Sequence, residues 1–528
     1  MDSSLLNLLI VAAAIALTIF AIDYKIKRRK LETLGNIIPG PKPLPLLGNI
    51  LTFVHIKNAK DLWDILMVEL KKCQTEYGNI FRYWIGPVLI VFVCDVEDMT
   101  TLLNSQHASM KHWWYVRVLN FMSHGAFGLN GKVWHGFRKA MVRFFPLKSI
   151  QSYVEVFVSK SEQLMSIVET KVGAGVVNVH ELIKYYSLDN ISITHLGAED
   201  MNEMEENRHD FFHHLEQALD MTFRRVVKPQ YIIDSIFHMS PAGKELRRTE
   251  KNLTSVSRRI VQNRLDVLSV RGVDLNADDF EEECYTDYII KKGIKDGATM
   301  QKMALMLTDL VVAGSDTTGI AMAYTILCLA MYPEYQEKAY QEQLDIFGDS
   351  DRPPTFKEAM GMPYLSMCYK EAIRLHGVIG IARSITGDVE VGGYTVPEGA
   401  AIYLLFYVLH RDPRFYCRPN EFYPDHFLPE AVSRRPKNSY IVFSHGSRNC
   451  PGAFYSQISA KILLSQLIRK FRFTSPLKYS DLRFRFSLML ENVDGYPVEI
   501  HSRMQKSNVQ NSPFSPTFIS DIDGLRLR

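Results

Sequence analysis

Phe443-Ser-His-Gly446-Ser-Arg448-Asn-Cys450-Pro-Gly452 is the stretch of sequence that decides the fold. A sulfur ligand must approach a metal ion from one side, so its cysteine has to stand on a tight loop. Gly446 permits backbone conformations that other residues avoid, which lets this loop turn back on itself. The apolar periodicity that begins near Ala453 predicts a helix directly after the loop, and the positive end of its dipole would favour the thiolate form of Cys450. The alternative is a buried structural cysteine beside an ordinary glycine-rich turn.

The loop closely resembles the signature F-x-x-G-x-R-x-C-x-G of the cytochrome P450 superfamily. The resemblance implies a b-type haem whose iron takes Cys450 as its axial thiolate ligand. It also implies that Phe443 packs on the haem, that Arg448 pairs with a propionate, and that Gly446 and Gly452 make room for the turn and the macrocycle.

A second motif, Ala313-Gly-Ser-Asp316-Thr317-Thr, lies within a long apolar segment. The small residues would leave space for dioxygen, while the Thr317 hydroxyl and the Asp316 carboxyl could supply the protons that cleavage of an O–O bond requires. Taken alone, the segment could be a helix whose threonine hydroxyl bonds back to a carbonyl. Beside the Cys450 loop it resembles the superfamily's A-G-x-D-T pattern, and it predicts Asp316 and Thr317 as catalytic residues of a monooxygenase.

Glu371 and Arg374 form an E-x-x-R pair, one helical turn apart and in apolar surroundings. In the superfamily a third member of this network is the arginine of a P-E-R-F motif. This chain has Pro424-Asp-His426-Phe instead, and an imidazole lacks the forked donors of arginine. His376-Gly377 is a second departure, at a position where relatives commonly carry proline.

Further residues are candidates to bind the haem propionates. Trp134 and Arg138 resemble the superfamily's W-x-x-x-R helix and stand one turn apart, although a surface arginine beside a core tryptophan is the alternative. Arg383 is a third candidate donor. The segment 111–115 (Lys-His-Trp-Trp-Tyr) is predicted either to form a roof over the active site or to pack in the core.

The N-terminal part of the chain resembles a membrane anchor. Residues 5–22 are almost all apolar and would span about 27 Å as a helix. Basic residues follow this run rather than precede it, which favours an uncleaved signal-anchor over a cleaved signal peptide or a core helix, with the body on the cytosolic side. We therefore predict an anchor at 1–30, a proline-rich hinge at 31–50, one catalytic domain at 51–501 and a disordered tail at 502–528.

The body reads as mainly α with a small β portion, which is the cytochrome P450 fold that the resemblance implies. Hydrophobic patterns predict strands at 80–84, 88–93 and 389–396, helices at 147–172, 210–226, 251–267 and 300–331, and an exposed loop at 272–295.

Composition excludes several other classes of protein. A formal charge of only +3 does not favour nucleic-acid binding. The seven cysteines include no C-x-x-C pair, so a zinc site or dithiol redox motif is not supported, and six of the seven are expected to be inert.

Together these features predict a haem-thiolate monooxygenase of the endoplasmic-reticulum (microsomal) membrane. It would insert one atom of O₂ into a lipophilic substrate, with electrons from NADPH supplied by NADPH–cytochrome P450 reductase and with cytochrome b5 as a second candidate donor. The donor would dock on the Cys450 face through basic residues such as Lys461. A non-catalytic or atypical haem-binding protein of the same fold is the alternative.

Segments 340–354 and 391–397 are similar to the animal fourth P450 family, whose members are implied to act on fatty acids, hormones or xenobiotics. Many fatty-acid hydroxylases of that family carry a glutamate that esterifies the haem. Ala313 stands at that position here, which excludes covalent attachment by this route.

Overall fold

The computed structural model describes residues 28–198, 205–275, 277 and 281–503, together with a few isolated positions before residue 28. Most of the predicted anchor and the tail from residue 504 lie outside the described residues. Within the described part, one helix is long and apolar enough to cross a membrane: α14 (Met300–Met331). Because 83% of its most apolar window is buried inside the protein, α14 is the central core helix.

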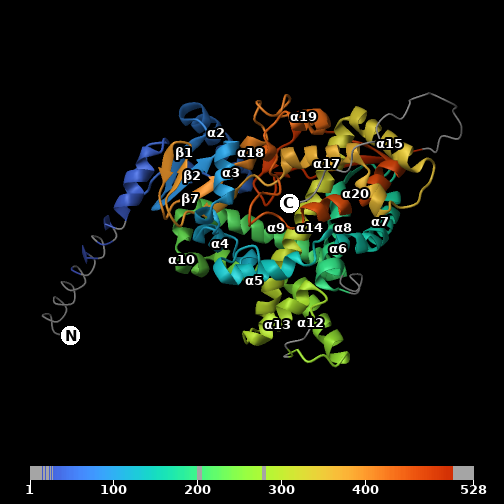
Figure 1. Ribbon diagram of the computed structural model, residues 1–528, viewed down its shortest axis with the longest axis horizontal. Helices are drawn as coiled ribbons and strands as arrows, with labels where there is room; N and C mark the ends of the chain where they lie inside the picture. The colour runs from blue at the N-terminus through green and yellow to red at the C-terminus, as the bar shows by residue number, and fades with distance from the viewer. Residues whose placement is uncertain are drawn as a thin grey trace.

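The described chain is mainly helical, and its largest sheet lies at one side of it (Figure 1). Besides α14, the α-helices are α2 (Ala59–Tyr77), α3 (Val96–Asn104), α4 (Trp113–Val118), α5 (Gly131–Val142), α6 (Leu147–Ser152), α7 (Val154–Glu169), α8 (Val179–Leu196), α9 (Glu205–Val227), α10 (Asp234–Met239), α11 (Pro241–Leu253), α12 (Ser255–Val270), α13 (Tyr285–Lys295), α15 (Pro333–Phe347), α16 (Phe356–Met360), α17 (Pro363–His376), α18 (Phe406–Leu409), α19 (Pro429–Ser433) and α20 (Ala453–Lys470).

Within the described residues, four small sheets make up the β portion. Strands β1 (Ile80–Ile85), β2 (Val88–Val93), β7 (Ala401–Leu404) and β4 (Ile381–Ser384) form the largest sheet in that order; β2 pairs with β7 in parallel and the other pairs are antiparallel. The remaining strands are β3 (Val176–Asn178), β5 (Val389–Val391), β6 (Tyr394–Val396), β8 (Phe471–Thr474), β9 (Phe484–Arg485), β10 (Glu491–Asn492) and β11 (Pro497–Ser502).

Most predicted elements are confirmed, with two differences in the helices. The predicted helix 147–172 is two helices, α6 and α7, which meet at Tyr153, and the segment 251–267 joins the end of α11 to α12. The predicted loop 272–295 is wrong in its second half, which is helix α13. Its apolar residues Tyr285, Ile289 and Ile290 are fully buried, and Asp287 forms a buried ion pair with Arg264 of α12.

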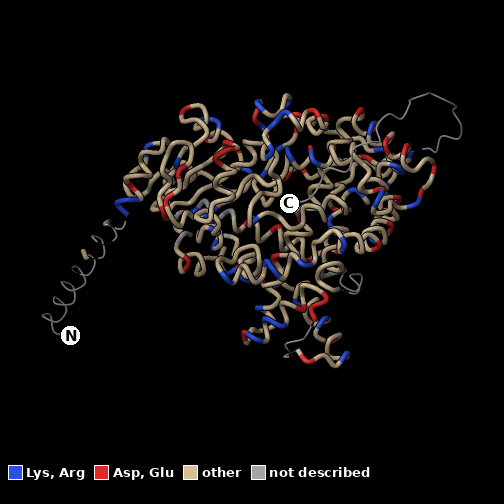
Figure 2. The backbone as a smooth tube through the Cα atoms, in the orientation of Figure 1, with Lys and Arg blue, Asp and Glu red and all other residues tan. Residues whose placement is uncertain are grey.

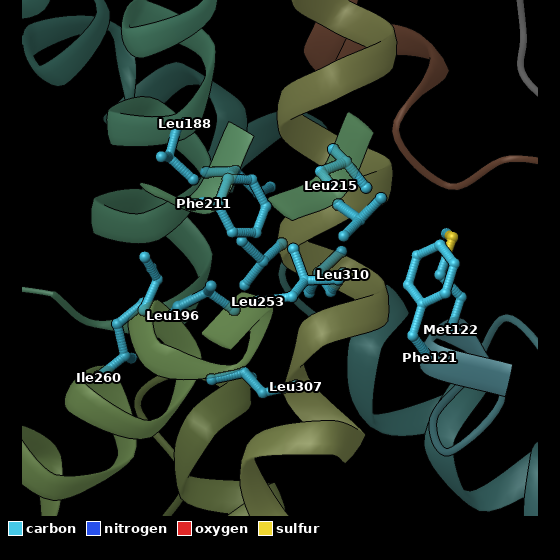
Figure 3. Close-up of a cluster of buried hydrophobic side chains, with 14 of the residues drawn as sticks. Phe121, Met122, Leu188, Leu196, Phe211, Leu215, Leu253, Ile260, Leu307 and Leu310 are labelled. Atoms are coloured by element: carbon cyan, nitrogen blue, oxygen red, sulfur yellow. The ribbon is translucent and has the colours of Figure 1, made fainter. Parts of the chain in front are cut away.

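The core surrounds α14, whose 32 residues span about 48 Å. Leu307 and Leu310 of α14 face side chains of α8, α9, α11 and α12 (Figure 3). Each fully buried leucine of this kind stabilises the fold by roughly 1.5–3 kcal/mol relative to an exposed one. Helix α8 lies so close to α14 that a Cβ on Gly314 would stand 2.6 Å from Ile191 Cγ1. Close helix packing therefore accounts for the small residue at this position.

Candidate active site

A cavity of about 290 Å³ lies between α14 and the loop that precedes α20. Most of the predicted site residues line it: Trp134, Arg138, Thr317, Arg383, Phe443, Arg448, Cys450 and Gly452. The other five, Gly446, Asp316, Glu371, Arg374 and His426, are not among the residues of its wall. These five lie in neighbouring positions that are described below.

The Cys450 loop is folded back on itself by backbone hydrogen bonds. The Cys450 amide donates to the Phe443 carbonyl at 2.8 Å. Gly446 has φ +76°, and a Cβ at this position would come within 2.2 Å of the Leu103 carbonyl oxygen at the end of α3. The loop therefore requires glycine at residue 446 for two reasons: its backbone conformation and its close contact with α3.

Cys450 is exposed and lines this cavity. Burial raises the pKa of the Cys450 thiol, while the Gly452 amide and Arg138 act in the opposite direction. Helix α20 begins at Ala453, as predicted, and the Gly452 amide at its N-terminus favours the thiolate form of Cys450, although burial outweighs this effect in the protein alone. A metal ion bound to the sulfur would supply the missing stabilisation, since coordinated thiols lose their protons.

Four cationic side chains gather at one end of the cavity: Lys111, Arg138, Arg383 and Arg448. The Arg448 guanidinium stacks 3.7 Å from the centre of the Trp134 ring, and it donates to the Leu129 carbonyl and to Asn130 Oδ1, each at 2.9 Å. Burial together with Arg383 and Arg138 lowers the pKa of Arg448 to about 9. Arg448 Nε is buried without a hydrogen-bond partner among the described residues. Lys111 and Arg383 are buried and the two other cations are half-buried, and such a group of like charges favours a bound anion.

Lys111 is a member of this cluster that the sequence analysis did not identify as one. Burial lowers the pKa of Lys111 well below its ordinary value, and Arg383 and Arg448 add to the effect. The predicted aromatic roof is only partly observed. Trp114 lines a second cavity, which is described below, whereas Trp113 is 46% exposed. The sequence offered one signal for this role, the position of Lys111 within the aromatic segment 111–115.

Asp316 and Thr317 are neighbours on α14 but face different cavities. The Thr317 hydroxyl reaches the Cys450 cavity and donates to the Ala313 carbonyl at 2.6 Å, so the back-bonded alternative is also correct. Asp316 faces a polar cleft of about 780 Å³ that α8, α9 and the β9–β10 hairpin border. Burial and then Glu491 raise the pKa of Asp316 well above its ordinary value. The two residues of the motif therefore lie on different faces of α14, Asp316 towards the polar cleft and Thr317 towards the Cys450 cavity.

Asp309 also lines the Cys450 cavity, although the sequence analysis did not identify it. It stands two turns before Asp316 on α14, and its Oδ2 accepts a hydrogen bond from the Phe127 amide at 2.8 Å. Burial raises the pKa of Asp309 from 3.8 to about 7, against two backbone hydrogen bonds that lower it. The sequence offers no motif for this contact, which joins residues 182 positions apart.

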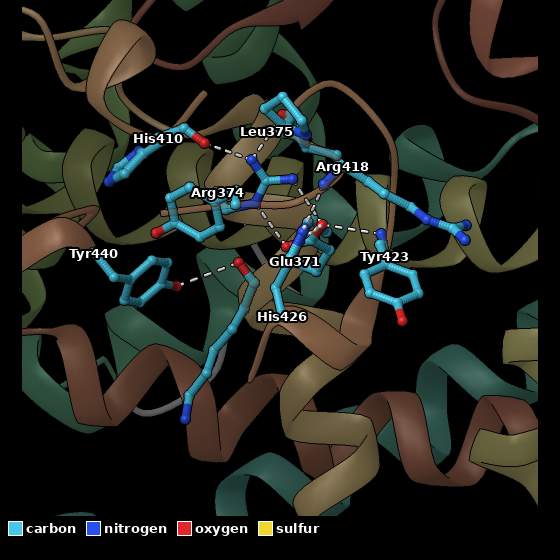
Figure 4. A network of polar contacts seen from close by, with 12 residues as sticks. Glu371, Arg374, Leu375, His410, Arg418, Tyr423, His426 and Tyr440 are labelled. Atoms are coloured by element: carbon cyan, nitrogen blue, oxygen red, sulfur yellow. Dashed lines mark hydrogen bonds and ion pairs between the residues drawn. The ribbon is translucent and has the colours of Figure 1, made fainter. Parts of the chain in front are cut away.

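The Glu371–Arg374 pair is fully buried on α17 and makes two hydrogen bonds of 2.7 Å (Figure 4). His426 Nδ1 lies 3.0 Å from Glu371 Oε1, so the imidazole takes the place that the resemblance gives to an arginine. Burial raises the pKa of Glu371, but Arg374 and His426 outweigh it and the net shift is downward. The predicted disturbance of the network by His426 is therefore not observed in its contacts.

His376 is equally well accommodated. Its ring stacks on Tyr324 with the centroids 3.9 Å apart, and its Nε2 lies 3.1 Å from the Tyr479 hydroxyl oxygen. A Cβ on Gly377 would stand 2.3 Å from the Ile373 carbonyl oxygen. His376 and Gly377, the second departure from the superfamily pattern, are therefore well packed.

A second cavity, of about 210 Å³, adjoins the first. The two share Val378 and Leu488 as wall residues, and the second extends between α2 and the β1–β2 hairpin. Its wall is almost wholly apolar, with Phe53, Leu66 and Phe92 among its side chains.

One prediction about a surface group is wrong. Lys461 is 6% exposed, and burial with Lys370 nearby lowers its pKa to about 8, so it offers no surface charge for docking. Of the six cysteines expected to be inert, five are buried, but Cys417 is exposed. Basic and acidic residues are interspersed along the described chain in the orientation of Figure 2.

Comparisons with known proteins identify the family. The family model described as Cytochrome P450 matches residues 38–493. The chain is 27% identical to "Cytochrome P450 4c21" of Blattella germanica over 95% of this chain and 99% of that protein. It is 28% identical to "Cytochrome P450 4c3" of Drosophila melanogaster over 92% and 93%, and 25% identical to "Cytochrome P450 4V2" of Rattus norvegicus over 90% and 91%.

These matches confirm both the superfamily and the resemblance to the fourth P450 family of animals. Enzymes of this family bind haem through a cysteine thiolate. The chain therefore belongs to the cytochrome P450 family and is a haem-thiolate monooxygenase.

Proposed function

We propose that this enzyme binds haem b in the Cys450 cavity, with Cys450 as the axial ligand, and oxygenates lipophilic substrates that enter through the second cavity. The proposal rests on the arrangement of the Cys450 cavity. One wall carries the Cys450 sulfur, another carries Thr317, and cationic side chains gather at one end. The orphaned Arg448 Nε supports the fit of an anionic group at that end.

Within this arrangement Arg138, Arg383, Arg448 and Lys111 would hold the propionates, and Trp134 would support Arg448 by stacking. The haem, when bound, supplies the activation of dioxygen that inserts one oxygen atom into the substrate and converts the other to water. Asp316 would take protons from the polar cleft, and Thr317 would pass them into the Cys450 cavity. Phe443 and Gly452 would form the floor beneath the ring.

The substrate class follows from the second cavity. Its apolar wall favours a hydrocarbon chain or ring system over a polar metabolite, because each buried polar group would need a partner there. A fatty acid, a hormone-like lipid or a xenobiotic meets this condition. Ala313 leaves no carboxylate for esterification of the haem, so the haem would be removable by acid extraction.

Electrons would reach the enzyme from NADPH through NADPH–cytochrome P450 reductase, or cytochrome b5, at the endoplasmic-reticulum membrane. Helix α5 adjoins the Cys450 loop through a 2.6 Å hydrogen bond from Arg138 to Asn449, and it exposes Lys132 and Lys139. These two lysines replace Lys461 as our candidates for docking an acidic partner surface.

The decisive test is the spectrum of the dithionite-reduced enzyme with carbon monoxide. We expect a Soret band far to the red of that given by an imidazole-ligated haem, and Cys450→His should abolish this shift while leaving haem bound. An unshifted band in the unmodified enzyme would contradict thiolate ligation by Cys450. A screen of medium- and long-chain fatty acids, with NADPH and reductase, would then test the substrate class.

A further inference from the structure

The tip of the hairpin formed by β9 and β10 lies where the two cavities adjoin. Residues 486–489 make up this tip: the first two line the second cavity, the last lines the Cys450 cavity, and Leu488 lines both. Among the described wall residues, the two cavities share Leu488 and Val378. A lipophilic chain that occupied both cavities would therefore have to pass the hairpin tip.

The backbone of this hairpin provides little to hold the tip in place. Strands β9 and β10 have two residues each, and Arg485 is paired with Glu491 at the end next to the tip. The Phe486 amide donates to the Ala59 carbonyl at 3.1 Å, whereas the amides of residues 487–489 make no hydrogen bond within the described part of the chain. Because a short two-stranded hairpin is marginally stable by itself, side-chain contacts must contribute to the position of its tip.

The side chain of Arg485 joins the two strands. Its Nε and Nη2 donate to Glu491 Oε2 at 2.8 and 2.6 Å, and its Nη1 lies 2.9 Å from Glu216 Oε1 of α9. Burial lowers the pKa of Arg485, but Glu491 and then Glu216 outweigh burial and the net shift is upward. The Glu491 side chain is 12% exposed and the Glu216 side chain is 60% exposed. Since exposed ion pairs contribute little, the pair with Glu491 is the stronger of the two contacts.

We propose that the ion pair of Arg485 and Glu491 positions the hairpin tip, and that it thereby sets how far a lipophilic chain extends from the Cys450 cavity into the second cavity. Arg485 lines neither of these cavities, so it is a positioning residue that acts through Leu488 and its neighbours. A wall that is held in place before binding costs less to order when a ligand arrives. The inference rests on the proposed function, in which substrates enter through the second cavity.

Two iron-binding compounds, N-methylimidazole and N-decylimidazole, test this inference without requiring catalysis. The imidazole ring of each would bind the haem iron in the Cys450 cavity, and only the decyl chain is long enough to pass Leu488. Optical titration of the holoenzyme gives both dissociation constants. In the unmodified enzyme, each methylene group that is buried in the second cavity should tighten binding up to about fourfold. Binding of these compounds does not depend on proton supply, which Glu491 and Arg485 also influence through Asp316.

Arg485→Met removes the ion pair, and Arg483→Met is its matched control. Arg483 pairs with Asp494 at the open end of the same hairpin, and its side chain is 58% exposed. We expect Arg485→Met to weaken the binding of N-decylimidazole about tenfold and to leave that of N-methylimidazole unchanged, whereas Arg483→Met should change neither. Equal affinity of the two variants for N-decylimidazole would overturn the proposal, and so would an equal loss of affinity for both compounds in Arg485→Met.

Arg485→Lys covers the case in which the methionine variant does not fold, because lysine keeps a cation opposite Glu491. Lysine has a single nitrogen and cannot bind Glu491 through two donors and Glu216 through a third. We expect this variant to bind N-decylimidazole about threefold more weakly than the unmodified enzyme and N-methylimidazole equally well. Unchanged binding of both compounds would overturn the proposal.

The unmodified enzyme separates this inference from the proposed function. If neither compound bound to the iron, the haem site of the proposed function would be wrong, and this inference with it. If both bound with the same affinity, chains would not enter the second cavity, and the entry route and this inference would both be overturned while the haem site stood.

Discussion

Gly446→Ala separates the two reasons why the Cys450 loop needs glycine. The substitution places a methyl group on a residue with φ +76° and within 2.2 Å of the Leu103 carbonyl oxygen. The backbone conformation alone costs about 1–2 kcal/mol for a residue with a Cβ. The overlap with a backbone atom of α3 cannot be relieved by a side-chain rotation, and it should cost a further 1–3 kcal/mol or so.

Gly393→Ala is the matched control. Gly393 has φ +82°, nearly the same conformation, but a Cβ there would meet nothing within 4 Å. This variant should therefore show the conformational cost only. Any additional loss in Gly446→Ala measures the contact between the Cys450 loop and α3.

The assay is chemical denaturation of both variants, followed by far-ultraviolet circular dichroism, together with the haem content of the purified proteins. We expect Gly446→Ala to be destabilised by about 1–3 kcal/mol more than Gly393→Ala and to retain less haem, because the displaced loop carries Cys450. Equal stability and equal haem content in the two variants would refute the reasoning from the Leu103 contact.

Three other predictions concern buried groups. Asp309 has its pKa raised from 3.8 to about 7, so the folded protein binds more protons than the unfolded one between these values, and its stability falls as pH rises from about 4 to 7. Asp309→Asn should remove this fall, and urea unfolding at pH 4 and pH 8 checks it; a slope that persists would contradict the assignment. Thr317→Val should lower product formed per NADPH roughly tenfold or more, while Thr325→Val, which loses the same kind of helix hydrogen bond outside the cavity, should not. Arg374→Met leaves Glu371 buried without its main partner and should cost about 3–5 kcal/mol in urea unfolding; a loss below 1 kcal/mol or so would show that the pair is dispensable.

Local sequence patterns predicted the elements that depend on neighbours in the chain. The segment 300–331 is helical over its whole predicted length, and the strands predicted at 80–84 and 88–93 are both present, paired as a hairpin. These assignments succeeded because long apolar runs and period-two alternation act over a few residues. The prediction of a loop at 272–295 was wrong because the acidic first half of the segment hid the apolar spacing of α13. That spacing produces a helix because its apolar residues pack against the core.

The replacement of an arginine by His426 illustrates a different limit. The residue types showed that the superfamily network was altered, but they did not show that the imidazole would reach Glu371 and at the same time face Cys417. Residue 426 is 55 positions from Glu371 in the chain. No periodicity links residues at such distances: the family resemblance placed residue 426 in the network, but only the structure showed which atoms the imidazole contacts.

The Cys450 loop, the E-x-x-R pair and the Asp316-Thr317 motif are determined by the sequence alone, because each is a short pattern whose spacing is set by one turn or one helix. The tertiary structure decided what these patterns face. It placed Lys111 and Asp309 in the Cys450 cavity, opened Asp316 to a different cleft from Thr317, and buried Lys461. The physical reason is that burial, cavity walls and pKa shifts arise from the packing of distant segments, and a sequence pattern carries no information about which segments will pack together.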